Sequence, residues 1–158
     1  MRRRWLTWFI GAGLTLLPSG AVAQKDGAPL PKNSYWISSP FGWRVHPISG
    51  VWRMHLGVDL ACPVGTRVRA VREGFVIVAG RHSCFGLVVV LLHPGNIVTL
   101  YAHLSRIADG MFPGSVVRRG QVIALSGATG CVTGPHLHFE WLEGGKPVDP
   151  VPLLAESR

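Results

Sequence analysis

Beyond residue 17, the sequence has no long run of apolar residues and no stretch in which apolar side chains recur with the 3.6-residue period of a helix. It also has no internal repeat and no heptad pattern. These absences exclude a second membrane-spanning segment, a repeat solenoid and a coiled coil. What remains has the size of one compact domain.

The first 23 residues have the pattern of a secretory signal peptide. Three arginines at positions 2–4 precede an apolar run over residues 5–17, and Ala21-Val22-Ala23 forms a cleavage site that would leave Gln24 as the first residue. The first cysteine, Cys62, lies far from this site, so no lipid anchor is expected there. We therefore expect a periplasmic or secreted protein with no membrane association after cleavage.

Acidic residues are few, with 8 Asp and Glu against 16 Lys and Arg, so the formal net charge is +8. Removal of the three N-terminal arginines would leave +5. A basic exported protein can be attracted to an acidic polymer, although the charge alone does not distinguish this from simple solubility. Nucleic acid is not expected as a partner, because the chain carries an export signal and no Lys/Arg cluster lies on a helical face.

The spacing of turn residues predicts a fold built from strands. Residues 24–34 are polar and contain prolines, which predicts a flexible lead-in. From Tyr35 on, short runs rich in Val, Ile and Leu alternate with Gly, Pro or Asn. We expect strands at residues 68–71, 75–79, 87–93, 97–103, 116–117, 121–126 and 136–142. The fold class is therefore all-β, with a single antiparallel β-sheet domain and long Gly-rich loops over residues 35–152, followed by a C-terminal tail over residues 153–158.

Two polar groups interrupt the apolar runs. If residues 55–59 form one strand, His55, Gly57 and Asp59 face the same side, and Gly57 keeps the space before the two polar groups clear. His55 and Asp59 can then reach one metal ion.

The second group is the stretch over residues 136–140, where polar and apolar residues alternate. In a strand, His136, His138 and Glu140 share one face while Leu137 and Phe139 face the core. Two imidazoles on an otherwise apolar strand are costly to bury without partners. A third position of interest is His103, which ends another apolar strand, where a general base or a transition-state donor could lie.

Two histidines and one carboxylate, with water in the fourth position, form a catalytic zinc site. Further imidazoles can then transfer protons or stabilise an oxyanion. The alternative is a set of separate structural histidines, and either motif alone would be a weak signal. Together, in a glycine-rich β context, they strongly favour a metal site.

With these motifs the sequence resembles the LytM/lysostaphin-type zinc metalloendopeptidases. The resemblance covers roughly residues 38–150. Its motifs are His55-x-x-x-Asp59, Tyr101-Ala-His103-Leu104, Gly134-Pro135-His136-Leu137-His138-Phe139-Glu140, Phe41-Gly-x-Arg44-x-His46-Pro47, Pro63-x-Gly65-Thr66-x-Val68 and Gly127-x-Thr129-Gly130.

The resemblance implies one Zn²⁺ per chain, bound by His55, Asp59 and His138, with His103 and His136 as catalytic imidazoles beside a narrow substrate groove. It implies hydrolysis of amide bonds in peptidoglycan peptide cross-links. The lack of a wall-targeting module favours D,D-endopeptidase specificity, and a monomer is the expected state. A catalytically silent cell-wall-binding or regulatory protein on the same fold is the alternative. A non-haem iron oxygenase also uses two histidines and one carboxylate, but it would leave His103 and His136 without a role.

Three cysteines in an exported chain allow three pairings. By the resemblance, Cys84 and Cys131 lie in loops that flank the groove, so we predict a Cys84–Cys131 disulfide and a free, buried Cys62. Five further residues carry separate expectations. Arg44 is expected either to bind a substrate carboxylate or to be a buried structural residue, and His93 to be structural. The tryptophans that cluster early in the chain could lie in the core or on a sugar-stacking surface, and we expect the core: Trp36, Trp43 and Trp52.

Overall fold

The computed structural model describes residues 26–45 and 48–156, so the predicted signal peptide and the His46-Pro47 motif lie outside the described part of the chain. Among the described residues, no helix reaches the length and apolarity that crossing a bilayer requires.

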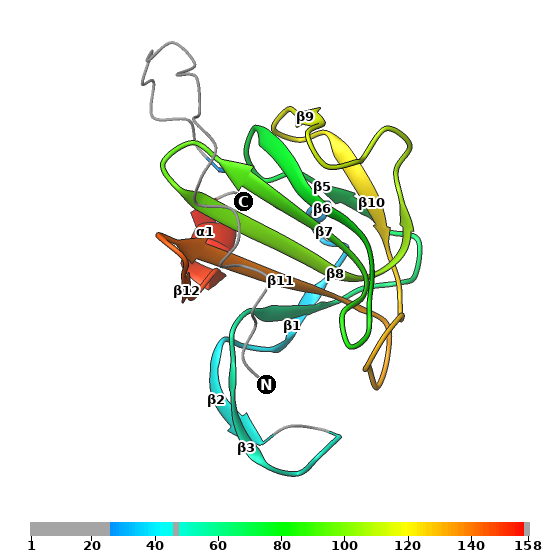
Figure 1. Ribbon diagram of the computed structural model, residues 1–158. Coiled ribbons are helices and arrows are strands. Elements are labelled where there is room, and N and C mark those ends of the chain that lie inside the picture. The colour runs from blue at the N-terminus through cyan, green and yellow to red at the C-terminus, as the bar shows by residue number, and fades with distance from the viewer. Residues whose placement is uncertain (1–25, 46–47, 157–158) are drawn as a thin grey trace.

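Most strands in the described residues belong to one large antiparallel sheet (Figure 1). Its order is β1-β4-β11-β8-β7-β6-β9, while β12 pairs with β11 and β10 pairs with both β5 and β8. The strands of this sheet are β1 (Trp36–Ser39), β4 (Val58–Ala61), β5 (Arg67–Arg69), β6 (Gly74–His82), β7 (Gly86–His93), β8 (Ile97–Ile107), β9 (Val116–Val117), β10 (Val122–Ser126), β11 (His136–Glu143) and β12 (Lys146–Val148). The predicted all-β antiparallel fold is confirmed.

The apolar run of β7 is continuous because both faces of this strand are buried. Val89 and Leu91 pack into one hydrophobic cluster, and Val88 and Val90 pack into a second cluster on the other face. In β11 the polar and apolar residues alternate as predicted, since Leu137, Phe139 and Trp141 lie in the first cluster. The side chains of His136, His138 and Glu140 are therefore left on the opposite face.

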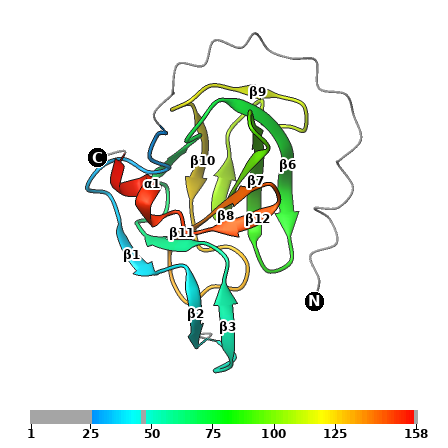
Figure 2. The same ribbon diagram turned by 90° about the vertical axis from the view of Figure 1, so that its left-hand side faces the viewer.

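The remaining two strands, β2 (Gly42–Val45) and β3 (Trp52–His55), form a separate hairpin that projects from the main sheet (Figure 2). Trp43 lies opposite Met54 and Val45 lies opposite Trp52, so these four side chains share one face. Trp43 is 70% exposed and Trp52 is 66% exposed. The expectation that the early tryptophans lie in the core is wrong, and Trp36 in β1 is likewise exposed.

The assumption of one strand through residues 55–59 is also wrong. β3 ends at His55 in the hairpin, and β4 begins at Val58 in the main sheet, where it pairs with β1 and β11. Gly57 has a different role from the expected one: a Cβ at this position would overlap the Phe139 carbonyl oxygen and crowd Glu140. Glycine thus lets the chain cross close to β11 between the hairpin and the sheet.

Both ends of the described chain pack more tightly than the sequence suggested. Leu30, in the segment predicted to be a flexible lead-in, is 1% exposed and belongs to the core, and Arg72 forms an ion pair with Asp26 at 2.6 Å. At the other end, a short helix, α1 (Val151–Glu156), extends beyond residue 152, and its Leu154 is buried in the same core. The folded part therefore includes residues assigned to the lead-in and to the C-terminal tail.

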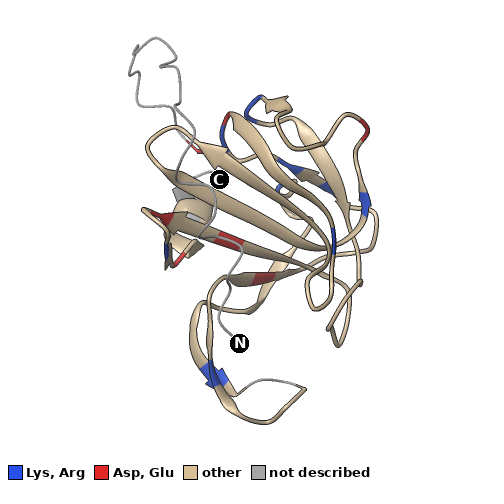
Figure 3. Ribbon diagram, in the orientation of Figure 1, with Lys and Arg blue, Asp and Glu red and all other residues tan. Residues whose placement is uncertain are grey.

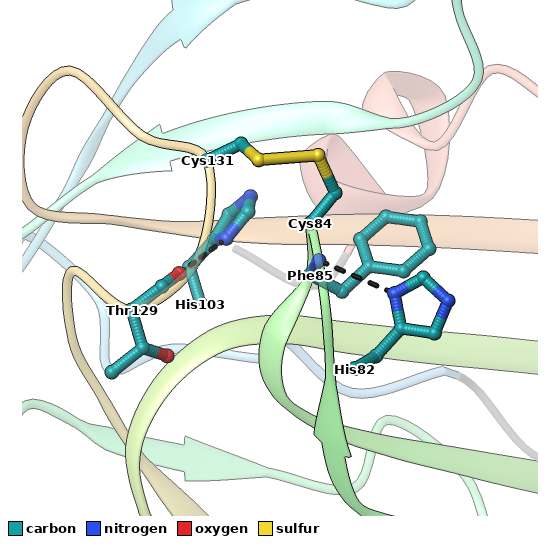
Figure 4. Close-up of a disulfide and its surroundings, with 6 residues drawn as sticks. All are labelled: His82, Cys84, Phe85, His103, Thr129 and Cys131. Atoms are coloured by element: carbon teal, nitrogen blue, oxygen red, sulfur yellow. Dashed lines mark hydrogen bonds between the residues drawn. A yellow bond between two sulfur atoms is a disulfide. The ribbon is translucent and has the colours of Figure 1, made fainter.

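The cysteine prediction is confirmed: Cys84 and Cys131 form a disulfide (Figure 4), and Cys62 is free and buried.

Candidate metal centre

Three side chains that are distant in sequence converge at the junction of the hairpin and the main sheet. His138 of β11 lies directly opposite Asp59 of β4 in the antiparallel register, which brings His138 Nδ1 to 2.8 Å from Asp59 Oδ1. His55, at the end of β3, places its Nε2 3.2 Å from Asp59 Oδ1 and 3.2 Å from His138 Nδ1. All three ligand atoms lie within 4.8 Å of one another, so this group could hold a metal ion.

The other nitrogen of each imidazole has its own partner. His55 Nδ1 donates to the Pro40 carbonyl at 2.8 Å, and His138 Nε2 donates to Glu140 Oε1 at 2.9 Å. With a metal ion in place of a proton, each ring would carry its lone pair on the nitrogen that faces Asp59. Such outer partners fix the tautomer of metal-binding histidines, so the residues present fit a metal ion.

The charges around the three side chains stabilise a positive charge between them. Burial alone lowers the pKa of His138, but its hydrogen bonds to Asp59 and Glu140 outweigh burial and raise the pKa to about 9. Burial alone raises the pKa of Asp59, yet the hydrogen bonds from His138 and His55 hold it well below its usual range. Strands β4 and β11 carry no Lys or Arg, and basic residues lie mainly in loops and peripheral strands (Figure 3).

Arg44 of the hairpin adds one cation at the edge of the group. Its Nη2 donates to Asp59 Oδ2 at 3.3 Å, on the carboxylate oxygen that does not contact the imidazoles. Through this contact with the Asp59 carboxylate, Arg44 supports the geometry of the candidate site. It orients Asp59 so that Oδ1 faces the two histidines.

Two further imidazoles stand beside this group. The ring centroids of His103 and His136 are 4.8 Å apart, and His136 Nε2 lies 3.7 Å from Asp59 Oδ1. His136 Nδ1 donates to the Gly134 carbonyl at 2.9 Å, and His103 Nδ1 donates to the Thr129 carbonyl at 2.9 Å. In the neutral form of each ring, the lone pair therefore lies on Nε2.

His103 is held in its neutral form at neutral pH. Burial lowers its pKa to about 4, and the neighbouring His138 and His136 add to this effect, against the opposing hydrogen bond to the Thr129 carbonyl. The backbone of His103 has a φ of 62°, a conformation that is uncommon for a residue other than glycine. Such residues often occur at functional sites, where the surrounding structure holds them.

The five residues singled out from sequence thus meet in one place. The groups that orient them were not predicted from the sequence: the carbonyls of Pro40, Gly134 and Thr129, the Glu140 carboxylate and the Phe85 ring that stacks on His138 at 5.7 Å. Glu140 had a detectable signal, since it lies two residues after His138 on the same strand face. The backbone carbonyls had none, because any residue supplies one.

An open cavity of about 500 Å³ lies next to His136. Its lining is mainly apolar and includes Trp36, Cys62 and Pro135. The cavity offers space for a ligand on the His136 side of the site.

Comparisons with known proteins place the chain in a family. Residues 53–150 match the model of peptidase family M23. The DD-carboxypeptidase/endopeptidase Mpg of Neisseria meningitidis is 48% identical over 115 residues, which are 73% of this chain and 26% of that protein. The peptidoglycan DD-endopeptidase ShyA of Vibrio cholerae is 44% identical over 133 residues, which are 83% of this chain and 30% of that protein. This chain therefore spans only about a quarter to a third of the length of these relatives.

A solved structure agrees with the sequence matches. The crystal structure of a zinc-containing peptidase from Vibrio cholerae matches with a TM-score of 0.73 and 39% identity, covering 83% of this chain and 40% of that chain. The family model covers more than half of this chain, and its matched region contains all five histidine and aspartate positions described above. The chain therefore belongs to peptidase family M23, the LytM/lysostaphin-type zinc metallopeptidases that its motifs resemble.

Proposed function

We propose that this protein is a zinc metalloendopeptidase that hydrolyses amide bonds in peptidoglycan peptide cross-bridges, with D,D-endopeptidase specificity. The observation that carries the proposal is the convergence of His55 Nε2, Asp59 Oδ1 and His138 Nδ1, with two further imidazoles at their side. Structural histidines scattered in a core would not share one carboxylate oxygen in this way.

His55, Asp59 and His138 are the proposed zinc ligands. Zinc at this site would supply a Lewis acid that polarises a carbonyl and lowers the pKa of a water to about 7. The chain supplies the rest of the geometry. Pro40 and Glu140 fix the ring orientations of the two histidines, and Arg44 holds the second oxygen of Asp59.

His103 and His136 are the proposed catalytic imidazoles. Each ring donates its Nδ1 proton to a backbone carbonyl, so each can accept a proton at Nε2 and return it to a leaving amine. Once protonated, the same Nε2 can donate a hydrogen bond to a developing oxyanion. Two imidazoles with centroids 4.8 Å apart can divide these tasks between them.

The substrate class rests on the relatives, two of which carry the names of a peptidoglycan DD-endopeptidase and a DD-carboxypeptidase/endopeptidase. The sequence pattern of residues 1–23 supports export to the periplasm or beyond, where peptidoglycan lies. Cleavage after Ala23 should leave Gln24 as the first residue, which N-terminal sequencing of the exported protein would test.

The proposed reaction can be tested on purified, cross-linked muropeptide dimers. Zinc-loaded protein should convert D-Ala-to-diamino-acid dimers to monomers and leave the glycan intact, as followed by chromatography and mass spectrometry. Dimers joined by glycine-rich bridges, assayed in parallel, report the bond specificity, and release of D-Ala from pentapeptides reports carboxypeptidase activity. Release of sugar fragments would contradict the proposed amide hydrolysis, and binding to sacculi without cleavage of any bond would replace the enzymatic proposal with the wall-binding alternative.

A further inference from the structure

Two loops that meet beside His103 are joined covalently. Cys84 lies in the loop between β6 and β7, and Cys131 lies in the loop between β10 and β11, 47 positions later. Next to the disulfide, the Cys131 N–H donates to the Cys84 carbonyl at 2.9 Å. Figure 4 shows the disulfide beside the His103 ring, with Phe85 and Thr129 in the two loops.

Each of the two loops supplies one hydrogen-bond acceptor to His103. From the first loop, the Phe85 carbonyl accepts the His103 backbone N–H at 2.9 Å. From the second loop, the Thr129 carbonyl accepts His103 Nδ1–H at 2.9 Å. The first acceptor is one residue from Cys84 and the second is two residues from Cys131. The backbone conformation of His103 and the orientation of its ring thus both depend on where these loops lie.

The junction between the loops has little space for adjustment. A Cβ at Gly86 would overlap Thr129, and a Cβ at Gly130 would overlap the Cys84 carbonyl. Thr129 Oγ1 accepts the Leu87 N–H at 3.0 Å and donates to the Leu104 carbonyl at 2.7 Å. The loops therefore touch backbone to backbone, so a small separation would break several contacts of Thr129 at once.

We propose that the Cys84–Cys131 disulfide is a positioning element for the reaction: it holds the Phe85 and Thr129 carbonyls on His103 and so fixes His103 with its lone pair on Nε2. The two cysteines have no direct part in the reaction in this proposal. They act through His103, whose left-handed backbone conformation needs support from its surroundings. The catalytic part of this inference rests on the proposed function, whereas the effect on the ring of His103 does not.

A disulfide also stabilises a fold by restricting the unfolded chain, so the test must separate positioning from stability. The variant is Cys84→Ser/Cys131→Ser, purified as folded, zinc-loaded protein. The matched control is Val76→Ala, which removes buried side-chain volume in β6 away from the site and lowers the melting temperature. Comparison at a temperature where both variants are fully folded removes the effect of stability.

The direct readout is the nitrogen-15 NMR signal of the His103 ring, assigned from the spectrum of His103→Ala. In the wild type and in Val76→Ala, His103 should show one tautomer with a slowly exchanging Nδ1 proton. In the double serine variant, that proton should exchange at least 10-fold faster. An unchanged exchange rate and tautomer in the double serine variant would overturn the proposal.

The kinetic readout uses a double-mutant cycle with His103→Ala. Loss of the disulfide should lower kcat roughly 10-fold, a decrease in the range known for groups that orient a functional histidine. KM and zinc content should change by less than twofold. In the His103→Ala background, the same loss should change kcat less than twofold. An equal decrease in both backgrounds would mean that the disulfide acts elsewhere and would overturn the proposal. Wild-type protein that is inactive on every cross-bridge would overturn the proposed function but not the positioning of His103, because the NMR measurement tests that positioning independently of activity.

Discussion

Glu140 accepts a hydrogen bond from His138 Nε2 at 2.9 Å although its side chain is completely buried. A buried carboxylate is stable only when it is paired, and here the pair determines which nitrogen of His138 faces Asp59. The two residues lie two positions apart on the same face of β11. A single strand therefore supplies a proposed zinc ligand and the group that orients it.

Replacement of Glu140 by Gln should retain the size of the side chain but remove its charge. We expect zinc affinity to fall about 10- to 100-fold, as is usual when an outer partner of a metal-binding histidine is lost. Competition with a chelator of known affinity measures the effect. Glu143→Gln, an exposed position on the same strand, is the matched control, and equal weakening in both variants would contradict the assigned role.

Replacement of Asp59 by Ala should remove metal and activity together, because this carboxylate is the contact shared by His55 and His138. Elemental analysis of folded protein should find far less than one zinc per chain. Asp109→Ala, whose side chain is 93% exposed, should retain full zinc as a control. Full zinc occupancy in Asp59→Ala would show that the proposed ligand set is wrong.

Replacement of His103 or His136 by Ala should leave zinc bound and lower turnover about 100-fold or more, as expected for loss of a positioned proton-transfer group or oxyanion donor. Zinc content and cleavage of muropeptide dimers are measured on the same samples. Metal loss in either variant would instead assign that imidazole to the ligand set.

The spacing of residues was sufficient to predict the all-β fold and the meeting of His55 and Asp59, because polar residues at strand spacing are conspicuous against Val- and Leu-rich runs. The third position, His138, followed from the family resemblance. The sequence was misleading about the path of the chain between His55 and Asp59. A strand through residues 55–59 and the observed break at residues 56–57 both bring His55 and Asp59 together, so the spacing alone did not distinguish them.

The tryptophans show a second limit of the sequence. Large aromatic residues are usually buried, and alternation in β2 and β3 does not reveal that residues 26–45 and 48–156 provide no second layer on the apolar face of this hairpin. The contacts of Leu30 and Leu154 with the core were equally hidden, since short segments flanked by polar residues carry no periodic signal.

The exposed and buried tryptophans should differ sharply in their contribution to stability. Trp141→Ala should lower the free energy of unfolding by about 3–5 kcal/mol, because its ring is 1% exposed in the core. Trp43→Ala should change it by no more than about 0.5 kcal/mol, as is usual for surface positions. Denaturant titration of both variants measures the difference. A large loss in Trp43→Ala would mean that the hairpin face is covered in solution.

The buried His93 should make stability depend on pH. Its Nδ1 lies 2.7 Å from the Glu73 carbonyl and its Nε2 lies 2.7 Å from Thr99 Oγ1. Burial lowers the pKa of His93, and the charge of Arg72 adds to this effect, against the opposing Glu73 carbonyl. As the pH falls below the ordinary value of about 6.5, the unfolded chain therefore binds a proton that the folded protein does not yet bind.

The contribution of neutral His93 to stability is thus complete above about pH 6.5 and decreases as the pH falls toward the lower pKa of the folded state. In His93→Gln, which cannot titrate, this part of the decrease should vanish. The difference in free energy of unfolding between wild-type and variant protein should therefore shrink from pH 7.5 to pH 5.5, as measured by denaturant titration of zinc-saturated samples. A difference that stays constant over this range would show that His93 has the same pKa in the folded and unfolded states.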